Sequence, residues 1–250
     1  MPAKTQFAIL SFAALLAAGL GAGGALSQGT PDYAAIVAAP DRSEADRTAD
    51  KRRDPVPFLA FAGLRPGMKV LDMGAGGGYS TELVARAVAP NGTAYGQNPA
   101  DLPERPKTAF EARTKTAGGK NIVAVARPFD DPVPPDVSNL DAITFLFFYH
   151  DTSYMAVNRP QMDAKMFAAL KPGGILVLAD HHAKPGEGTS VAKTNHRIEE
   201  SVVRSEIEAA GFKFVAAGDF WRHPEDPRDF NVNRPTGPVD NFVLKFEKPR

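Results

Sequence analysis

Two groups of residues in this chain are suited to chemistry, and the first is a glycine-rich segment that follows a short apolar run. Asp72 precedes three glycines at alternate positions, Gly74, Gly76 and Gly78. Glycine allows a sharp turn from a strand into a helix and lets a ligand lie against the main chain. Tyr79 breaks the glycine pattern of a dinucleotide loop, and no phosphate-loop ending of Gly-Lys-Ser/Thr follows. The nearby carboxylate disfavours a pyrophosphate and favours a ligand with a cationic amino group or sulfonium.

The second group consists of histidine and aspartate residues that follow two other apolar runs. Residues 147–151 close one run, with the sequence Phe-Phe-Tyr-His-Asp, and residues 180–182 close the other, with Asp-His-His. We expect the two runs to be neighbouring strands of one sheet. Three of the five histidines and two aspartates would then lie at one rim.

Three interpretations of this rim stay open. His150 or His181 could act as a general base. A divalent metal could bind there instead, since imidazole and carboxylate suit such ions, with ligands drawn from His150, Asp151, Asp180 and either His181 or His182. In the third interpretation these side chains only cap strand ends and loops. His181 and His182 would point to opposite faces of a continuing strand, so both do not easily join one site. We therefore assign catalytic roles to His150 and His181 and assign no metal ligand.

Short apolar runs alternate with helical patterns along most of the chain, which predicts an α/β fold. The predicted architecture is a doubly wound, mostly parallel, seven-stranded sheet with helices on both faces. The last run alternates apolar and polar residues, which indicates an antiparallel strand at the edge region of the sheet. Strands are expected at 69–73, 93–96, 122–126, 142–149, 175–179, 212–216 and 241–246, and helices at 55–63, 80–88, 106–117, 159–170 and 197–210.

The start of the chain has the pattern of an export signal. Lys4 and the free amine precede an apolar run over residues 7–20, and small residues at Ala25 and Ser27 fit a cleavage site. Residues 1–27 are therefore predicted to be a signal peptide, and the alternative is an uncleaved membrane anchor. The protein would be periplasmic or secreted. Residues 28–54, which contain Lys51, Arg52 and Arg53 close to their end, are expected to form a helical N-terminal cap or lid.

Composition narrows the range of functions. Lys plus Arg and Asp plus Glu number 29 each, so the formal net charge is zero and no large basic surface for nucleic acid is expected. The absence of cysteine excludes disulfides, thiolate metal sites and a cysteine nucleophile. A small-molecule acceptor is the expected partner, and a membrane would be contacted only through an uncleaved N-terminal segment.

Three motifs in order make residues 55–250 resemble the class I S-adenosylmethionine-dependent methyltransferases. They are Leu64 to Gly74 leading into the glycine loop, Leu170 to Gly174 before the fifth strand, and Ala209 to Phe212 before the sixth. The chain is similar in particular to uncharacterised bacterial methyltransferase-like proteins with export signals. The resemblance implies a Rossmann-like fold and S-adenosylmethionine as cofactor.

The resemblance also implies roles for single residues. Asp72 and the backbone of Gly74, Gly76 and Gly78 would hold the methionine part of the cofactor, beside Tyr79. Gln97 and Asn98 stand where the family usually has an acid that binds the ribose hydroxyls; amides can still hydrogen-bond them. Phe129 and Asp130 would flank the adenine, and the ring of Tyr149 could face the sulfonium, since an aromatic face attracts a cation.

Two functions follow as hypotheses. The first is methyl transfer from S-adenosylmethionine to a small-molecule acceptor. The second is an exported, non-catalytic relic of the fold that binds a ligand or none. The replacement of the acid by Gln97 and Asn98 favours the relic, as does an export signal on a protein whose cofactor is made in the cytoplasm.

Overall fold

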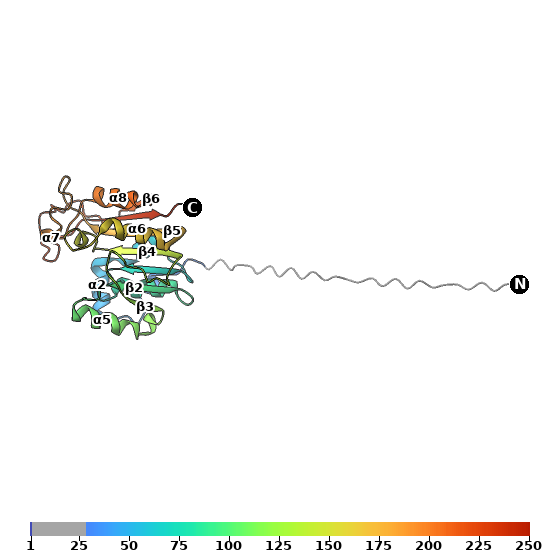
Figure 1. The fold of residues 1–250 in the computed structure, drawn as a ribbon. Coiled ribbons are helices and arrows are strands. Elements are labelled where there is room, and N and C mark those ends of the chain that lie inside the picture. The colour runs from blue at the N-terminus through green and yellow to red at the C-terminus, as the bar shows by residue number, and fades with distance from the viewer. Residues whose placement is uncertain (2–28) are drawn as a thin grey trace.

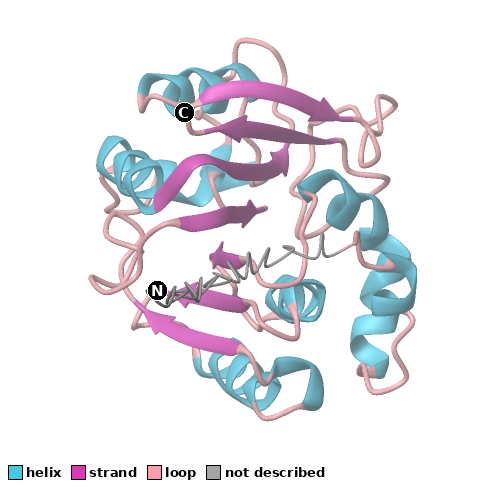
Figure 2. Ribbon diagram, turned by 90° about the vertical axis from the view of Figure 1, so that its right-hand side faces the viewer, coloured by secondary structure: helices cyan, strands magenta, loops and turns pink. Residues whose placement is uncertain are grey.

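The computed structural model describes residue 1 and residues 29–250, and these fold into one sheet with helices on both sides (Figures 1 and 2). The predicted signal peptide therefore lies outside the described residues, apart from residue 1. The strand order is β3-β2-β1-β4-β5-β7-β6. The strands are β1 Lys69–Met73, β2 Thr93–Asn98, β3 Ile122–Ala126, β4 Leu140–Leu146, β5 Leu170–His181, β6 Lys213–Gly218 and β7 Asn241–Glu247.

The strands from β3 through β5 in this order pair in parallel, and β7 runs antiparallel to both of its neighbours, β5 and β6. The predicted doubly wound, mostly parallel, seven-stranded sheet is thus confirmed. The antiparallel strand β7 lies one position in from the edge, since β6 pairs along its outer side.

Helices connect the strands at the positions that the sequence periodicity indicated. Pro55 lies at the start of α3 and Gly63 ends it in the left-handed conformation, as expected for these residue types. The helices are α1 Tyr33–Val37, α2 Glu44–Arg53, α3 Pro55–Ala62, α4 Tyr79–Val88, α5 Glu104–Thr114, α6 Arg159–Ala169, α7 Ala192–Asn195 and α8 Glu200–Ala209, with short 3₁₀ helices η1 Ala117–Gly119 and η2 His150–Ser153. Within the described residues, no helix combines the length and apolar character needed to cross a membrane.

Alternate residues of the central strands feed two separate hydrophobic cores. On one face, Val70 and Ala142 pack with residues of α3 and α4. On the other face, Leu71 and Ile143 pack with residues of α6 and α8. A strand buried on both faces must be apolar at consecutive positions, which accounts for the continuous apolar runs in the sequence.

Strand β4 ends earlier than the apolar run predicted. The run continues to Tyr149, but the strand stops at Leu146, and Phe147 has a left-handed φ of 58°. The chain then turns into η2, where the backbone N–H of His150 donates to the buried carboxylate of Asp180 at 2.8 Å. This turn decides where the aromatic and histidine side chains that follow β4 point.

Candidate active site

The loop from β1 into α4 adopts a left-handed backbone at each of its alternate glycines. The angle φ is 62° at Gly74, 54° at Gly76 and 81° at Gly78. β1 pairs with β2 on one side and with β4 on the other, so the loop lies at the point where the strand order reverses. Ligands of open α/β sheets bind at this point, beyond the carboxyl ends of the strands.

The three glycines differ in what surrounds them. A Cβ atom on Gly78 would lie 2.8 Å from Cδ of Arg113, so α5 fills that side of the loop. A Cβ on Gly74 would lie 3.3 Å from Cβ of Phe148. A Cβ on Gly76 would meet only one backbone oxygen, at 4.0 Å. Gly76 is therefore the glycine of the three that a ligand can approach.

Gln97 and Asn98, at the end of β2, bind the loop itself. Gln97 Oε1 accepts from the backbone N–H of Gly74 at 3.1 Å, and its Nε2 donates to the carbonyl of Arg127 at 2.7 Å. Asn98 Oδ1 accepts from the N–H of Gly76 at 2.7 Å, and its Nδ2 donates to the carbonyl of Gly76 at 3.1 Å. Both side chains are buried. The expectation that they contact ribose hydroxyls is corrected here, because both buried amides instead bind the backbone, Asn98 at Gly76 and Gln97 at Gly74 and Arg127.

Asp72 points into the protein beneath the loop. Its Oδ2 accepts hydrogen bonds from the hydroxyls of Ser80 at 2.8 Å and Thr81 at 2.6 Å, and its Oδ1 accepts from Thr144 at 2.7 Å. Burial raises the pKa of Asp72, and the three hydroxyl donors act in the opposite direction. Asp72 thus positions the start of α4 against β4, in place of the expected direct contact with a cofactor.

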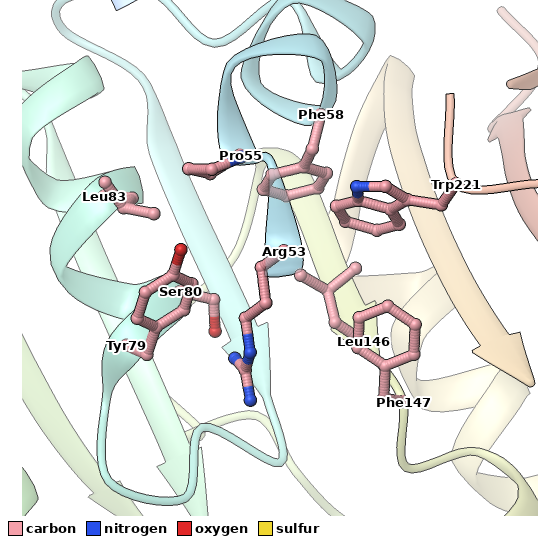
Figure 3. A pocket seen from close by; sticks show the side chains of 9 residues that line it. All are labelled: Arg53, Pro55, Phe58, Tyr79, Ser80, Leu83, Leu146, Phe147 and Trp221. Atoms are coloured by element: carbon pink, nitrogen blue, oxygen red, sulfur yellow. The ribbon is translucent and has the colours of Figure 1, made fainter. Parts of the chain in front are cut away.

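Arg53, the last residue of α2, reaches into the space beside the loop. Figure 3 shows it extending between Tyr79 and Ser80 on one side and Leu146 and Phe147 on the other. Its guanidinium carbon lies 4.6 Å from the centroid of the Tyr79 ring. Burial lowers the pKa of Arg53, and its side chain forms no hydrogen bond or ion pair with any described residue. The cavity beside it measures about 20 Å³.

Helix α2 is tied to the loop by a network of ion pairs. Arg113 of α5 donates to the carbonyl of Gly77 at 2.6 Å, to Asp46 of α2 at 2.6 Å and to Glu82 of α4 at 2.7 Å. Both carboxylates are buried. The segment before residue 55 is thereby fastened over the glycine loop.

Tyr79 faces this cap. Its hydroxyl donates to Asp50 at 2.6 Å, and burial together with that carboxylate raises the pKa of Tyr79. Its ring lines the small cavity beside Arg53, and its expected contact with the cofactor stays a prediction.

A larger cavity of about 440 Å³ lies on the far side of Phe147. Its lining contains cationic and neutral side chains and no carboxylate. Arg52 and Arg53 reach it from the cap, and the remaining lining residues are Phe147, His181, Trp221, His223, Val232, Asn233, Pro235, Gly237, Pro238, Val239 and Asn241. Arg53 lines both this cavity and the small one beside the glycine loop, so the two cavities adjoin. The larger cavity is called the second compartment below.

His181 lines this second compartment. Its ring stacks on Phe147 with centroids 4.9 Å apart, and its Nδ1 lies 2.6 Å from Oδ1 of Asn241. Burial lowers the pKa of His181 to about 4. The imidazole is therefore neutral at pH 7, the state that a general base requires, although the same burial makes it a weak base.

His150 does not share this position. It is 2% exposed, its Nδ1 lies 2.7 Å from Oδ1 of Asp180, and its Nε2 lies 3.2 Å from Nδ1 of His196. Burial opposes the charged form, but the carboxylates of Asp180 and Asp151 outweigh it and raise the pKa of His150 to about 10. A protonated, enclosed imidazole cannot take a proton from an acceptor, so the base assignment of His150 is corrected.

Tyr149 is also placed differently from the prediction. Its side chain is fully buried, and its hydroxyl lies 3.0 Å from Asp163 and 2.8 Å from Glu206, on α6 and α8. The early end of β4 turns the ring into the core beneath these helices. Tyr149 therefore does not face a sulfonium.

The residues expected around the adenine lie after β3. Phe129 is buried and stacks on Phe148, with ring centroids 4.9 Å apart, next to Gly74. Asp131 pairs with Arg127 and with Lys165, whereas Asp130 forms no ion pair with the described residues. Of the two neighbouring carboxylates, Asp130 is thus the one that is available to bind a ligand.

Comparison with known proteins agrees with this geometry. The family model of protein-L-isoaspartate(D-aspartate) O-methyltransferase matches residues 53–115, from Arg53 through the glycine loop to the C-cap of α5. A S-adenosylmethionine-dependent methyltransferase from Aquifex aeolicus is 19% identical, with a TM-score of 0.59, over 87% of this chain and 98% of that chain. One from Mesorhizobium loti is 15% identical, with a TM-score of 0.55, over 77% and 97%.

A third solved structure, the [4+2]-cyclase SpnF, is 16% identical, with a TM-score of 0.58, over 82% of this chain and 81% of that chain. The fold is therefore that of the class I S-adenosylmethionine-dependent methyltransferases, and the matching methyltransferase family model covers the part of the chain that contains the glycine loop. The matched family model and the fold imply S-adenosylmethionine as the cofactor.

Proposed function

We propose that this protein transfers a methyl group from S-adenosylmethionine to a small acceptor that carries an anionic group. The observation that carries the proposal is Arg53, a cation without an ion-pair partner among the described residues, which the cap places between the start of α4 and the end of β4. The methionine part of the cofactor carries a carboxylate, and a guanidinium binds a carboxylate with two parallel hydrogen bonds. The open approach to Gly76 supports the same orientation.

When bound, S-adenosylmethionine supplies an electrophilic methyl group on a sulfonium. The protein's own part is to align the acceptor with that methyl group and to keep water away, since positioning accounts for much of the acceleration in such a displacement. Phe147 separates the two cavities and borders both. Its backbone and the ring of His181 would thus lie next to the acceptor atom.

The lining of the larger cavity supports an anionic acceptor. Arg52, Arg53 and His223 contribute positive charge or hydrogen-bond donors, and no carboxylate opposes them. His181 is the group placed to remove a proton from an acceptor hydroxyl. The apolar run at residues 7–20 supports the further proposal that the protein acts outside the cytoplasm.

A non-catalytic relic is the second candidate, and two observations favour it. Gln97 and Asn98 occupy the backbone groups of Gly74 and Gly76. In addition, a cavity of about 20 Å³ does not hold a nucleoside unless Arg53 moves.

Calorimetric titration with S-adenosylmethionine separates the two. We expect one cofactor per chain and a loss of affinity of about 10- to 100-fold in Arg53→Met, because a charge-assisted pair is removed. Lys51→Met is the matched control, since Lys51 is exposed on the same helix and lines neither cavity. Absence of heat in the wild type would support the relic. Equal affinity in both variants would refute the role of Arg53.

A further inference from the structure

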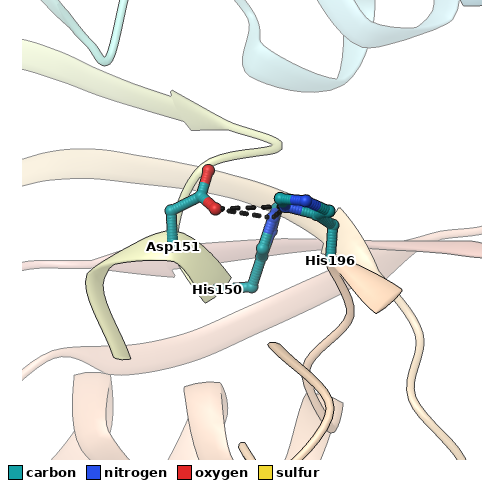
Figure 4. Close-up of side chains that lie close together, drawn as sticks. All are labelled: His150, Asp151 and His196. Atoms are coloured by element: carbon teal, nitrogen blue, oxygen red, sulfur yellow. Dashed lines mark hydrogen bonds and ion pairs between the residues drawn. The ribbon is translucent and has the colours of Figure 1, made fainter. Parts of the chain in front are cut away.

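Three side chains near the carboxyl ends of β4 and β5 converge on one point, separate from the glycine loop. They are His150 and Asp151 from η2 and His196 from the residue after α7 (Figure 4). Nε2 of His150 lies 3.2 Å from Nδ1 of His196, and Oδ1 of Asp151 lies 3.3 Å from each of these nitrogens. The three atoms thus form a nearly equilateral triangle.

The size of this triangle matches a tetrahedral metal ion. With metal–ligand bonds of about 2.0–2.1 Å, two ligand atoms of a tetrahedron lie about 3.3–3.4 Å apart. An octahedral ion with bonds of about 2.1 Å would bring adjacent ligand atoms to about 3.0 Å. The observed separations of 3.2 and 3.3 Å are nearer to the tetrahedral value.

A buried carboxylate orients the first ligand. Oδ1 of Asp180 lies 2.7 Å from Nδ1 of His150, and the side chain of Asp180 is fully buried at the end of β5. The same carboxylate accepts from the backbone N–H groups of His150 and His181, both at 2.8 Å. Asp180 therefore holds a proton of His150 on Nδ1 and turns Nε2 toward the triangle, so that a metal ion that displaces the Nε2 proton would meet the lone pair of this atom. Metal-binding histidines in proteins are commonly held by a carboxylate in this way.

The third ligand is held by backbone geometry. His196 follows α7 with a left-handed φ of 54°, an uncommon conformation for a residue with a side chain. The loop after β6 braces α7, since the carbonyl of Asn195 accepts from the N–H of Val232 and that of Thr194 from Asn231. The side chains of His196 and Asp151 are 24% and 14% exposed, so solvent reaches the triangle from that side.

We propose that His150 Nε2, His196 Nδ1 and Asp151 Oδ1 bind a zinc ion, with a water in the fourth position. Two imidazoles and a carboxylate without a thiolate form a donor set that zinc accepts, and a fourth open position characterises reactive zinc sites. Binding displaces the protons that bridge these atoms in the metal-free protein. The site does not involve the glycine loop, so it does not depend on the proposed methyl transfer.

Zinc binding to the purified full chain tests the proposal. After loading with ZnCl₂ and dialysis, mass spectrometry should find one zinc per chain, and calorimetry should give the affinity. His196→Asn should weaken binding at least 100-fold. Asparagine tolerates the left-handed backbone, so this variant is expected to fold. Asp180→Asn should weaken binding about 10- to 100-fold, as for other groups that orient a ligand.

The matched control is His223→Asn. His223 lies 3.2 Å from Glu225 on the surface, so it also pairs with a carboxylate, but among the described residues it belongs to no group of three possible metal ligands. His223→Asn should retain the zinc affinity of the wild type. Zinc should raise the melting temperature of the wild type and of His223→Asn, but not that of His196→Asn. The absorption spectrum of the protein loaded with Co²⁺ should be that of a four-coordinate ion. No retained zinc in the wild type, or equal zinc affinity in His196→Asn, would overturn the proposal in favour of a metal-free hydrogen-bond cluster.

Discussion

Asn98 binds Gly76 through both ends of its side-chain amide, accepting from the N–H at 2.7 Å and donating to the carbonyl at 3.1 Å. The glycine loop is thereby fixed from the end of β2 before any ligand arrives. An acid at the same position could satisfy the N–H but not the carbonyl. Asn98, where the methyltransferases that this sequence resembles usually have an acid, thus has a structural role that an acid could not fulfil.

Substitution of Asn98 should cost stability. In Asn98→Ala both backbone groups of Gly76 lose their partner, and we expect the free energy of unfolding to fall by about 1–3 kcal/mol. Asn98→Asp should be at least as unstable at pH 7, because a carboxylate would lie against the Gly76 carbonyl. Urea unfolding measures both. Asn91→Ala, in an exposed turn, is the control, and a loss at Asn98 no larger than at Asn91 would show that the two contacts contribute nothing.

Arg113 should be the residue on which the cap depends most. Its removal in Arg113→Ala leaves the buried carboxylate of Asp46 without its ion-pair partner, whereas Glu82 keeps Arg86. Leaving one buried charge unpaired costs about 3–5 kcal/mol. Limited proteolysis should also cut before residue 55 sooner than in the wild type. Lys115→Ala, at an exposed position two residues on, should change neither result. Wild-type resistance in Arg113→Ala would mean that apolar contacts alone hold the cap.

His181→Asn should lower the turnover number once an acceptor is known, while leaving the affinity for S-adenosylmethionine unchanged. The His181 side chain lines the larger cavity, where the acceptor is proposed to bind, and not the small cavity beside Tyr79. A loss of about 100-fold or more is typical when a general base is removed. Tritium transfer from labelled cofactor and parallel calorimetry provide the two readouts. A fall in cofactor affinity with unaltered turnover would contradict the assignment.

Asp163 should make stability depend on pH. The Tyr149 hydroxyl has one proton but contacts both Asp163 and Glu206. Burial, with Glu206 nearby, raises the pKa of Asp163 to about 7 from an ordinary value of 3.8. Between these two pH values the folded protein keeps a proton that the unfolded chain has released, so the free energy of unfolding falls as pH rises. The full effect is about 4 kcal/mol.

Asp163→Asn isolates this contribution, since the amide can donate to Tyr149 at every pH. The variant should match the wild type near pH 4 and exceed it in stability at pH 8, as measured by urea unfolding across the range. Parallel curves for the two proteins would show that Asp163 is ionised in the folded state at neutral pH.

The sequence was sufficient to predict the sheet, and the reason is that its signals are local. Each buried strand is a continuous apolar run, and Gly74 and Gly78 mark a turn that neighbouring residues alone require. The same local reading failed at Tyr149, because the strand stops at Leu146 once Phe147 adopts a left-handed backbone. A pattern of residue types does not reveal where such a turn falls.

The sequence did not predict which side chains contact one another within the site, and the reason is different. Asn98 meets Gly76 across 22 positions, and His150 meets His196 across 46. His196 lies in a long irregular connection with no periodicity to place it, so nothing singled it out from the other histidines. Gln97 and Asn98 were located correctly at the end of β2, but their targets depend on side-chain geometry.

The ties between the cap and the glycine loop have a kinetic consequence. Arg113 bridges Asp46, Glu82 and the Gly77 carbonyl, and Arg53 lies across the narrow space beside Tyr79. A nucleoside that binds in this space must displace Arg53. If the tied N-terminal helices move with it, the observed rate of association would level off at high ligand concentration, and the bound molecule would have a long residence time.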